Sequence, residues 1–215
     1  MTHITLRSSS VAVLMLCLAC GSPSPTGRGP ESNQPPTVTI AATPAGRPIV
    51  GVTTMTFSAT GTDPDGDGLT FTWDLGDGVT RSGPMASRLF ATEGSFAASV
   101  TASDGRGGTT TARTTVAAGS LSGTWTPLMN GVPLDSAELS QEGTTLYGAV
   151  DAGCCKHTFA GEIVHPRTVT LLFRFSGCKK RDLPFTGTVS AALDRIDTTG
   201  ANCNVPQTRF AFVRR

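Results

Sequence analysis

The stretch DPDGDGLTFTWDLGDG, from Asp63 to Gly78, joins a carboxylate-rich turn to an alternating apolar pattern and a second Asp/Gly turn. Apolar residues at every second position, with Gly and Asp at both ends, predict a β-strand flanked by turns. Leu69, Phe71 and Trp73 are then expected on one face of a sheet, and the threonines between them on the other. The chain is therefore expected to be built on short strands.

Similar short segments surround this strand in the first part of the chain. The expected strands cover residues 37–40, 54–59, 87–90, 95–102 and 109–116. Short strands at this spacing, separated by Gly- and Asp-rich turns, indicate a β-sandwich. The first domain is expected to extend over residues 35–118.

Several motifs in this domain resemble those of PKD domains. Trp73-Asp74-Leu75-Gly76-Asp77-Gly78 is similar to their WDFGDG signature. The likeness extends to the entry segment Asn33–Pro36, the acidic turn Asp63–Gly68, Gly94-Ser95-Phe96 and Val100–Asp104, and it departs at Arg88-Leu89-Phe90, where the family often has His-x-Tyr. The resemblance covers residues 33–118. It implies an immunoglobulin-like sandwich that serves as a non-catalytic extracellular interaction, adhesion or spacer module.

The acidic turn is the strongest candidate for a cation site. Its carboxylates lie close together, and Ca²⁺ prefers many oxygen ligands. The spacing approaches that of an EF-hand loop, but an EF-hand needs flanking helices, whereas this window runs through a strand. The resemblance to calcium-binding PKD domains implies ligands at Asp63, Asp65 and Asp104, with Asn33 as a further candidate. The alternative is that these residues only form turns, because Asp side chains bond their own backbone.

Residues 121–215 predict a second, antiparallel β domain. The expected strands cover residues 123–127, 136–141, 144–150, 158–164, 168–175, 185–192, 195–199 and 210–214. An even series of hairpins favours a meander closed into a small barrel, with a plain sandwich as the alternative. Gly123-Thr124-Trp125 resembles the Gly-x-Trp opening of lipocalin- and avidin-type barrels, which implies a small-ligand cavity inside the strands.

Four cysteines lie in the second domain: Cys154, Cys155, Cys178 and Cys203. Four cysteines of an exported protein allow three disulfide connectivities, and a bridge between neighbours closes a strained ring. We therefore expect two bridges, in which Cys178 and Cys203 each bind one of the adjacent pair. The alternative is a zinc site that includes His157 and His165, but the spacing matches no zinc pattern and an oxidising compartment favours disulfides.

The N-terminus predicts export. Arg7 and the short apolar run of residues 11–19 are typical of a signal peptide, expected over residues 1–19. Leu16-Cys17-Leu18-Ala19-Cys20 resembles the lipobox of bacterial lipoproteins, with Cys17 in place of the usual Leu. The resemblance implies cleavage before Cys20 and a lipid anchor on its sulfur, and the alternative is an ordinary secretory signal. Residues 20–34 are expected to form a disordered tether rich in Pro, Gly and Ser.

Composition and motifs argue against several function classes. Charged residues make up 15% of the chain and the net charge is +1, so nothing attracts the whole protein to nucleic acid. The sequence contains no nucleophile elbow and no phosphate cradle, and two Asp residues such as Asp194 and Asp197 are too common near turns to indicate catalysis. The basic run Lys179-Lys180-Arg181 indicates a solvated loop tip, or a contact with an anionic polysaccharide, lipid headgroup or acidic protein.

The sequence thus predicts an all-β, non-enzymatic protein of the bacterial cell envelope, held to the membrane by a lipid anchor. Its expected role is binding, adhesion or spacing toward a protein or polysaccharide, with no cofactor apart from structural calcium. Two alternatives stay open: a lipoprotein whose barrel encloses a small ligand, and an accessory module of an extracellular degradative system.

Overall fold

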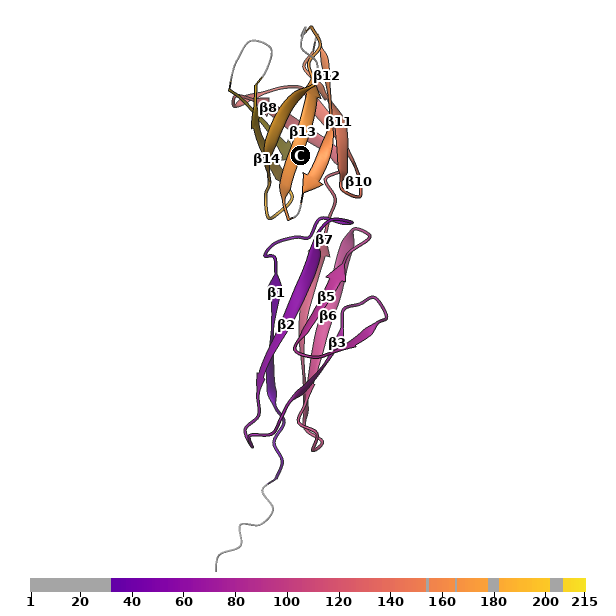
Figure 1. The fold of residues 1–215 in the computed structure, drawn as a ribbon, viewed down its shortest axis with the longest axis vertical. Helices are drawn as coiled ribbons and strands as arrows, with labels where there is room; N and C mark the ends of the chain where they lie inside the picture. Colours follow the sequence, from indigo (N-terminus) through magenta and orange to yellow (C-terminus); the bar gives the residue numbers. More distant parts are fainter. Residues whose placement is uncertain (1–31, 154, 165, 178–181, 202–206) are drawn as a thin grey trace, which may run out of the picture. The chain divides into compact units, whose positions relative to one another are not determined.

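The structure, a computed structural model, describes residues 32–153, 155–164, 166–177, 182–201 and 207–215 (Figure 1). These residues form an all-β fold, as the sequence predicted, with a sandwich followed by a barrel. The signal peptide, Cys20 and most of the tether lie outside the described residues, so the predictions made for them stay predictions. Among the described residues, no helix has the length and hydropathy needed to cross a membrane.

The first domain is a sandwich of two antiparallel sheets (Figure 1). One sheet has the order β1-β2-β5, and the other has the order β4-β3-β6-β7. The strands are β1 (Thr37–Thr43), β2 (Thr54–Thr62), β3 (Thr70–Asp74), β4 (Thr80–Ser82), β5 (Met85–Leu89), β6 (Gly94–Ser103) and β7 (Thr109–Ala118). The sequence anticipated all of these strands except β4.

Trp73 occupies the centre of the sandwich core, as its alternating strand predicted. Its side chain is fully buried, and its ring centroid lies 6.2 Å from that of Phe57 on the facing sheet. The Trp73 indole N–H donates a hydrogen bond of 2.9 Å to the Gly83 carbonyl, which satisfies its polar atom. Thr70 and Thr72 are exposed on the opposite face of β3.

The second domain is an eight-stranded barrel, which decides between the two architectures that the sequence allowed. Its strands are β8 (Gly123–Met129), β10 (Ser136–Glu142), β11 (Thr145–Asp151), β12 (Lys156–Val164), β13 (Thr168–Arg174), β14 (Leu183–Val189), β15 (Arg195–Gly200) and β16 (Thr208–Arg214). Consecutive strands pair from β10 to β16, and β8 closes the ring because it pairs with both β16 and β10. The short β9 (Val132–Pro133), which the sequence did not predict, pairs antiparallel with the end of β8.

Aromatic side chains fill the interior of the barrel. The ring centroid of Phe173 lies 4.9 Å from those of Phe185 and Phe210, and 5.1 Å from that of Phe159. Trp125 is fully buried beside them, and its indole N–H donates to the Leu121 carbonyl at 3.0 Å. These rings occupy the space in which the small-ligand alternative expected a cavity, so the interior is a packed core.

Two strand glycines allow neighbouring barrel strands to approach closely. A Cβ at Gly161 would collide with the Thr170 carbonyl on β13, and one at Gly187 would collide with the Asp197 carbonyl on β15. A glycine inside a strand often marks such a close approach of backbone to backbone. A larger residue at either position would therefore force the neighbouring strand to shift.

Candidate functional site

The acidic turn lies at one end of the sandwich and is held by its own carboxylates. One oxygen of Asp63 accepts hydrogen bonds from the backbone amides of Asp65 at 2.9 Å and Asp67 at 3.2 Å. The exposed Asp65 carboxylate accepts a hydrogen bond from the backbone amide of Gln34 at 2.7 Å. The two bonds to Asp63 are of the kind that the turn interpretation requires, because an Asp oxygen accepts backbone amides a few residues further along the chain.

Asp104 ties the end of β6 to the segment that enters the domain. Its side chain is buried, with one oxygen accepting the backbone amides of Arg106 at 2.7 Å and Gly108 at 3.0 Å. The other oxygen accepts the Asn33 side-chain amide at 2.7 Å. This bond from Asn33 is the main reason why the pKa of Asp104 lies below its ordinary value, because donors to the charged carboxylate stabilise it.

Three buried oxygens at this end have no hydrogen-bond partner among the described residues: Asn33 Oδ1, Asp63 Oδ2 and Asp67 Oδ2. An unpartnered buried acceptor costs free energy, which a bound cation or water can recover. The other Asp67 oxygen lies 3.2 Å from the Arg106 guanidinium, which joins Asp67 to the loop after Asp104. Oxygen-only ligands of this kind suit Ca²⁺.

These oxygens modify the ligand set that the PKD resemblance implied. Asp63 and Asn33 keep an oxygen for a cation, whereas both oxygens of Asp104 already accept hydrogen bonds and Asp65 is exposed. Asp67, which was left out of the predicted ligands, is the new candidate. In the sequence, the signal for Asp67 was that Asp occupies every second position of the turn. In the described part of the chain, no group of three or more His, Cys, Asp or Glu side chains is arranged for a metal, so the fit to calcium rests on these oxygens.

The predicted cysteine and histidine chemistry falls mostly outside the described residues. Cys155 lies half-buried just before β12, while Cys154, Cys178 and Cys203 are not described, so the two disulfides stay a prediction. His165 and the basic run 179–181 are not described either. His157 packs against Phe175 with a ring-centroid distance of 5.1 Å, and burial lowers its pKa. Its Nδ1 accepts the backbone amide of Ser176 at 3.1 Å, as expected of a structural histidine.

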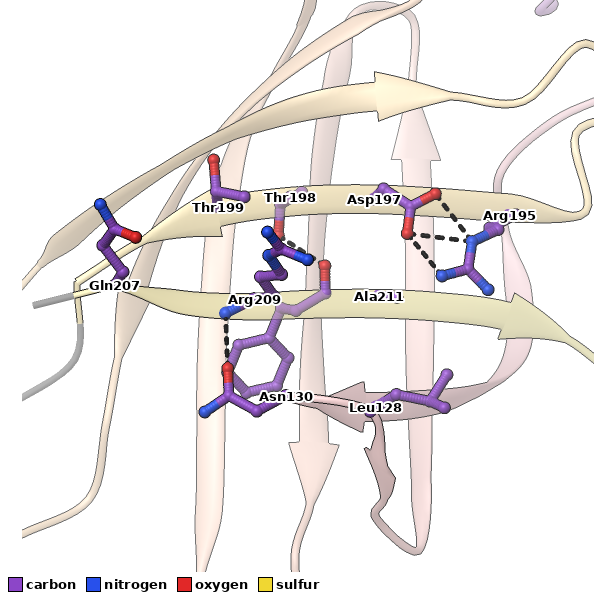
Figure 2. A pocket seen from close by; sticks show the side chains of 11 residues that line it. Leu128, Asn130, Arg195, Asp197, Thr198, Thr199, Gln207, Arg209 and Ala211 are labelled. Atoms are coloured by element: carbon purple, nitrogen blue, oxygen red, sulfur yellow. Dashed lines mark hydrogen bonds and ion pairs between the residues drawn. The ribbon is translucent and has the colours of Figure 1, made fainter. Parts of the chain in front are cut away.

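A groove crosses the outer wall of the barrel over β15, β16 and β8 (Figure 2). It has a volume of about 660 Å³ and is lined by Leu128, Asn130, Gly131, Arg195, Asp197, Thr198, Thr199, Gln207, Arg209, Phe210 and Ala211. On β15, strand alternation places Arg195, Asp197 and Thr199 outward. Of this set, only Asp197 was considered in the sequence, as one of two commonplace carboxylates.

The two carboxylates considered as a pair are engaged separately. Asp197 accepts hydrogen bonds from the Arg195 guanidinium at 2.6–2.9 Å (Figure 2). Asp194 instead accepts the Ser190 hydroxyl at 2.6 Å. The hydrogen bonds that Arg195 donates to Asp197 raise the pKa of Arg195 above its ordinary value. Each carboxylate is therefore engaged by a different neighbour, and the two do not form a carboxylate pair that shares one hydrogen-bond partner.

Asn130 and Arg209 join the turn after β8 to β16. The Asn130 side-chain oxygen accepts the Arg209 backbone amide at 2.9 Å, and the Asn130 backbone amide donates to the Arg209 carbonyl at 2.8 Å (Figure 2). Asn130 adopts a left-handed φ of 49°, which Asn tolerates better than most residues. Both bonds use the backbone of Arg209, and its guanidinium is exposed at the groove.

The sandwich end described above and its strand order agree with a match to the PKD domain family model over residues 37–117. Residues 37–117 form a PKD domain. PKD domains are typical of extracellular bacterial proteins and are usually non-catalytic accessory units. This placement agrees with the predicted export and with an immunoglobulin-like fold for the first domain.

Two known proteins are similar to this chain over about two fifths of its length. A microbial collagenase from Vibrio alginolyticus is 34% identical over 92 residues, which cover 43% of this chain and 11% of the collagenase. The chain therefore matches about a tenth of that protein's length. The PKD1 domain of Vibrio anguillarum Epp is 23% identical, with 41% of this chain and 99% of that domain covered and a TM-score of 0.35.

Two further solved structures are similar to this chain. The PKD domain of an M14-like peptidase from Thermoplasmatales archaeon SCGC AB-540-F20 is 23% identical, covers 40% of this chain and 98% of its own length, and has a TM-score of 0.35. A structure of carbohydrate-binding modules from the β-sandwich superfamily is 13% identical, covers 85% of this chain and 92% of its own, and has a TM-score of 0.39. None of these likenesses describes the chemistry of the barrel.

Proposed function

We propose that this protein is an exported, lipid-anchored component of the bacterial cell envelope that binds a partner without catalysing a reaction. The PKD domain acts as the spacer, and the barrel carries the ligand site on its outer wall. The observation that carries the proposal is the contrast within the barrel: phenylalanine rings fill the interior, while the outer wall holds a groove of about 660 Å³ lined by charged, polar and apolar residues.

The chemistry of the groove supports binding over catalysis. Its acidic side chain, Asp197, is committed to Arg195, and that contact raises the pKa of the guanidinium further from neutrality. A general acid or base instead needs a pKa near the working pH. The groove therefore offers fixed charges and hydrogen-bond donors, which recognise a ligand and leave its bonds intact.

Calcium at the acidic end would strengthen the spacer. Asp63, Asp67 and Asn33 would supply oxygens to the ion, which would join the entry segment to the acidic turn. Asp104 would hold Asn33 in place through its 2.7 Å hydrogen bond. The ion supplies charge that offsets the carboxylates, so the turn would be stiffer when calcium is bound.

Anchoring follows from Cys20 and the tether behind it. A lipid on the Cys20 sulfur would hold the chain at the membrane, and residues 20–34 would separate the PKD domain from it. A flexible chain of this length spans roughly 20 Å on average. The folded domains would then be displayed beyond the lipid headgroups.

Mass spectrometry of the exported protein tests the anchor. The wild type is expected to carry a lipid adduct and to sediment with membranes, and Cys20→Ala is expected to lose both properties. Cys17→Ala is the matched control, because it removes the neighbouring cysteine and leaves Cys20 for processing. A soluble wild type without an adduct would contradict the anchor.

A retention assay tests the non-enzymatic role. The full exported chain is incubated with insoluble cell-surface polysaccharides and with surface proteins, and both bound protein and released fragments are measured. The proposal predicts that at least one polymer retains the protein and releases no shorter products. Release of products that grows with incubation time would contradict it.

The second candidate is an accessory module of an extracellular degradative system. It is favoured by the 34% identity between the PKD region and part of a protein named as a collagenase. Retention of the full chain on fibrillar collagen, lost when the PKD domain is blocked by a domain-specific antibody, would support this candidate over a barrel-based role.

A further inference from the structure

The groove on the outer wall of the barrel has the size of a small-molecule site. Its volume of about 660 Å³ lies within the range of roughly 300–1,000 Å³ that is usual for ligand pockets. Leu128 and Ala211 contribute apolar surface to it, and the polar side chains of β15 and β16 surround that surface (Figure 2). The site therefore combines an apolar contact area with hydrogen-bonding groups.

One arginine side chain gives the groove a net positive charge. Arg195 is neutralised by Asp197 through contacts of 2.6–2.9 Å. Arg209 is exposed, and within the described residues no carboxylate lies within ion-pair distance of its guanidinium. A guanidinium presents a planar fork of donors that fits a carboxylate or sulfate group with two parallel hydrogen bonds. The groove can therefore bind one carboxylate or sulfate group through Arg209.

The neutral groups beside Arg209 suit hydroxyl groups. The oxygen of Asn130 accepts the Arg209 backbone amide, which leaves the side-chain nitrogen of Asn130 as a donor at the edge of the groove. Thr199 and Gln207 add a hydroxyl and a second amide, each of which can donate and accept. Sugar rings present hydroxyl groups at their edges and C–H groups on their faces, which match the amides and the apolar surface respectively.

We propose that this groove binds an acidic oligosaccharide, with Arg209 contacting its carboxylate and Asn130 donating to a neighbouring hydroxyl. The proposal rests on the non-enzymatic binding role and names the ligand class for it. A neutral saccharide would leave the Arg209 cation unmatched. A nucleic acid backbone requires a row of basic side chains. The groove does not offer such a row, because Arg195 is neutralised by Asp197 and Arg209 stands alone beside it.

Isothermal titration of the mature full chain with tri-galacturonate tests the assignment, with maltotriose as the neutral probe. Tri-galacturonate is expected to bind and maltotriose to bind at least about tenfold more weakly, because only the former offers a carboxylate. Arg209→Gln is expected to weaken tri-galacturonate binding by roughly tenfold or more. The hydrogen bonds of Arg209 described above involve its backbone, so this variant should keep the strand pairing.

Two variants in the groove are expected to change the affinity for tri-galacturonate in opposite directions. Asp197→Asn releases Arg195 from its ion pair and is expected to tighten binding several-fold. Asn130→Asp keeps the acceptor for the Arg209 amide and tolerates the left-handed φ, but it replaces the donor by a negative charge and is expected to weaken binding. Arg113→Gln, at an exposed position of β7 in the PKD domain, is the charge-matched control and is expected to change nothing.

Three outcomes overturn the groove assignment: no binding of tri-galacturonate, equal binding of maltotriose, or equal losses in Arg209→Gln and Arg113→Gln. Circular dichroism and thermal melting of each variant show whether the barrel stays folded, so a loss of fold is not mistaken for a loss of contact. Failure here is distinct from failure of the proposed function. The lipid adduct does not depend on Arg209, and retention on a neutral polysaccharide or a surface protein would still support the binding role if tri-galacturonate does not bind. Equal losses in both variants would point to binding elsewhere on the chain.

Discussion

The PKD domain and the barrel stabilise similar antiparallel strands in different ways. In the PKD domain, two separate sheets pack on Trp73 and Phe57, and buried carboxylates such as Asp104 hold the turns at one end. In the barrel, pairing of β8 with both neighbours closes the sheet, and contacting phenylalanine rings fill it. The PKD domain should therefore respond to calcium and acid, while the barrel should respond mainly to changes in its core.

The two tryptophans of the chain allow this comparison to be measured. Trp73 is buried in the PKD domain and Trp125 in the barrel. Trp125→Phe leaves Trp73 as the fluorescent reporter of the PKD domain, and Trp73→Phe leaves Trp125 as the reporter of the barrel. Unfolding of each domain can thus be followed in the intact chain.

The largest expected effect is the loss of the central ring of the barrel core. Phe173→Ala should destabilise the barrel by about 3–5 kcal/mol, because it removes ring contacts and leaves a cavity. Urea unfolding monitored by Trp125 measures this change. Leu172→Ala is the control at the adjacent outward position, which is 48% exposed, and its effect should stay within about 0.5 kcal/mol. Equal losses in both variants would contradict a packed interior.

The next effect should separate the domains by calcium. A calcium concentration a hundredfold above the Kd should stabilise the PKD domain by about 2.7 kcal/mol and leave the barrel unchanged. Asp67→Asn and Asp63→Asn should each weaken this response, because they remove charge from a buried oxygen that lacks a partner. Asp65→Asn, at an exposed position, should change it less. A calcium shift reported by Trp125, or none reported by Trp73, would contradict the assignment.

Acid should destabilise the PKD domain before the barrel core responds. The pKa of Asp104 is lowered in the folded state, chiefly by the hydrogen bond from Asn33. A lowered folded-state pKa gives stability that is present above the unfolded-state value near 3.8 and is lost as pH falls through the folded-state value. The Trp73 transition should therefore weaken below about pH 4, and Asn33→Ala should reduce this dependence. A pH-independent Trp73 transition across this range would exclude the role of Asp104.

The smallest effects should come from surface ion pairs. Arg81 donates to Asp77 at 2.7 Å and holds the pKa of that carboxyl down at about 2. Both side chains are partly exposed, so Asp77→Asn should cost no more than about 1 kcal/mol. Asp182→Asn in the barrel removes a more exposed pair with Arg174 and should cost close to nothing. A larger loss at Asp182 than at Asp77 would reverse the comparison.

The two domains also differ in how far their sequences predicted them. The turn and strand chemistry of residues 63–78 predicted the sandwich and the burial of Trp73, because Asp, Gly and alternation act over a few residues. In the barrel, the hairpins were predicted, but closure depends on β8 meeting β10 and β16 from distant parts of the chain. Local patterns do not encode such pairings, so sandwich and barrel remained open.

The candidate sites follow the same division. Asp63 was predicted, and Asn33 was a further candidate, because both lie in segments that resemble the PKD family. The buried oxygen of Asp67 that lacks a hydrogen-bond partner among the described residues is visible only once the turn is folded. The groove was not predicted, because Asn130, Arg195 and Arg209 come from three separate segments and form no motif. The strand alternation places Arg195 and Arg209 outward, yet alternation alone does not show that they border one groove.

The most direct test of this division of roles is a single set of amide NMR spectra of the intact chain, recorded with calcium and then with tri-galacturonate added. We predict that calcium shifts the amide signals around Asn33 and Asp67 and leaves the barrel unchanged. The saccharide should then shift signals around Asn130, Thr199 and Arg209 without changing those of the PKD domain. Saccharide-induced shifts confined to the PKD domain, or calcium-induced shifts confined to the barrel, would contradict the account.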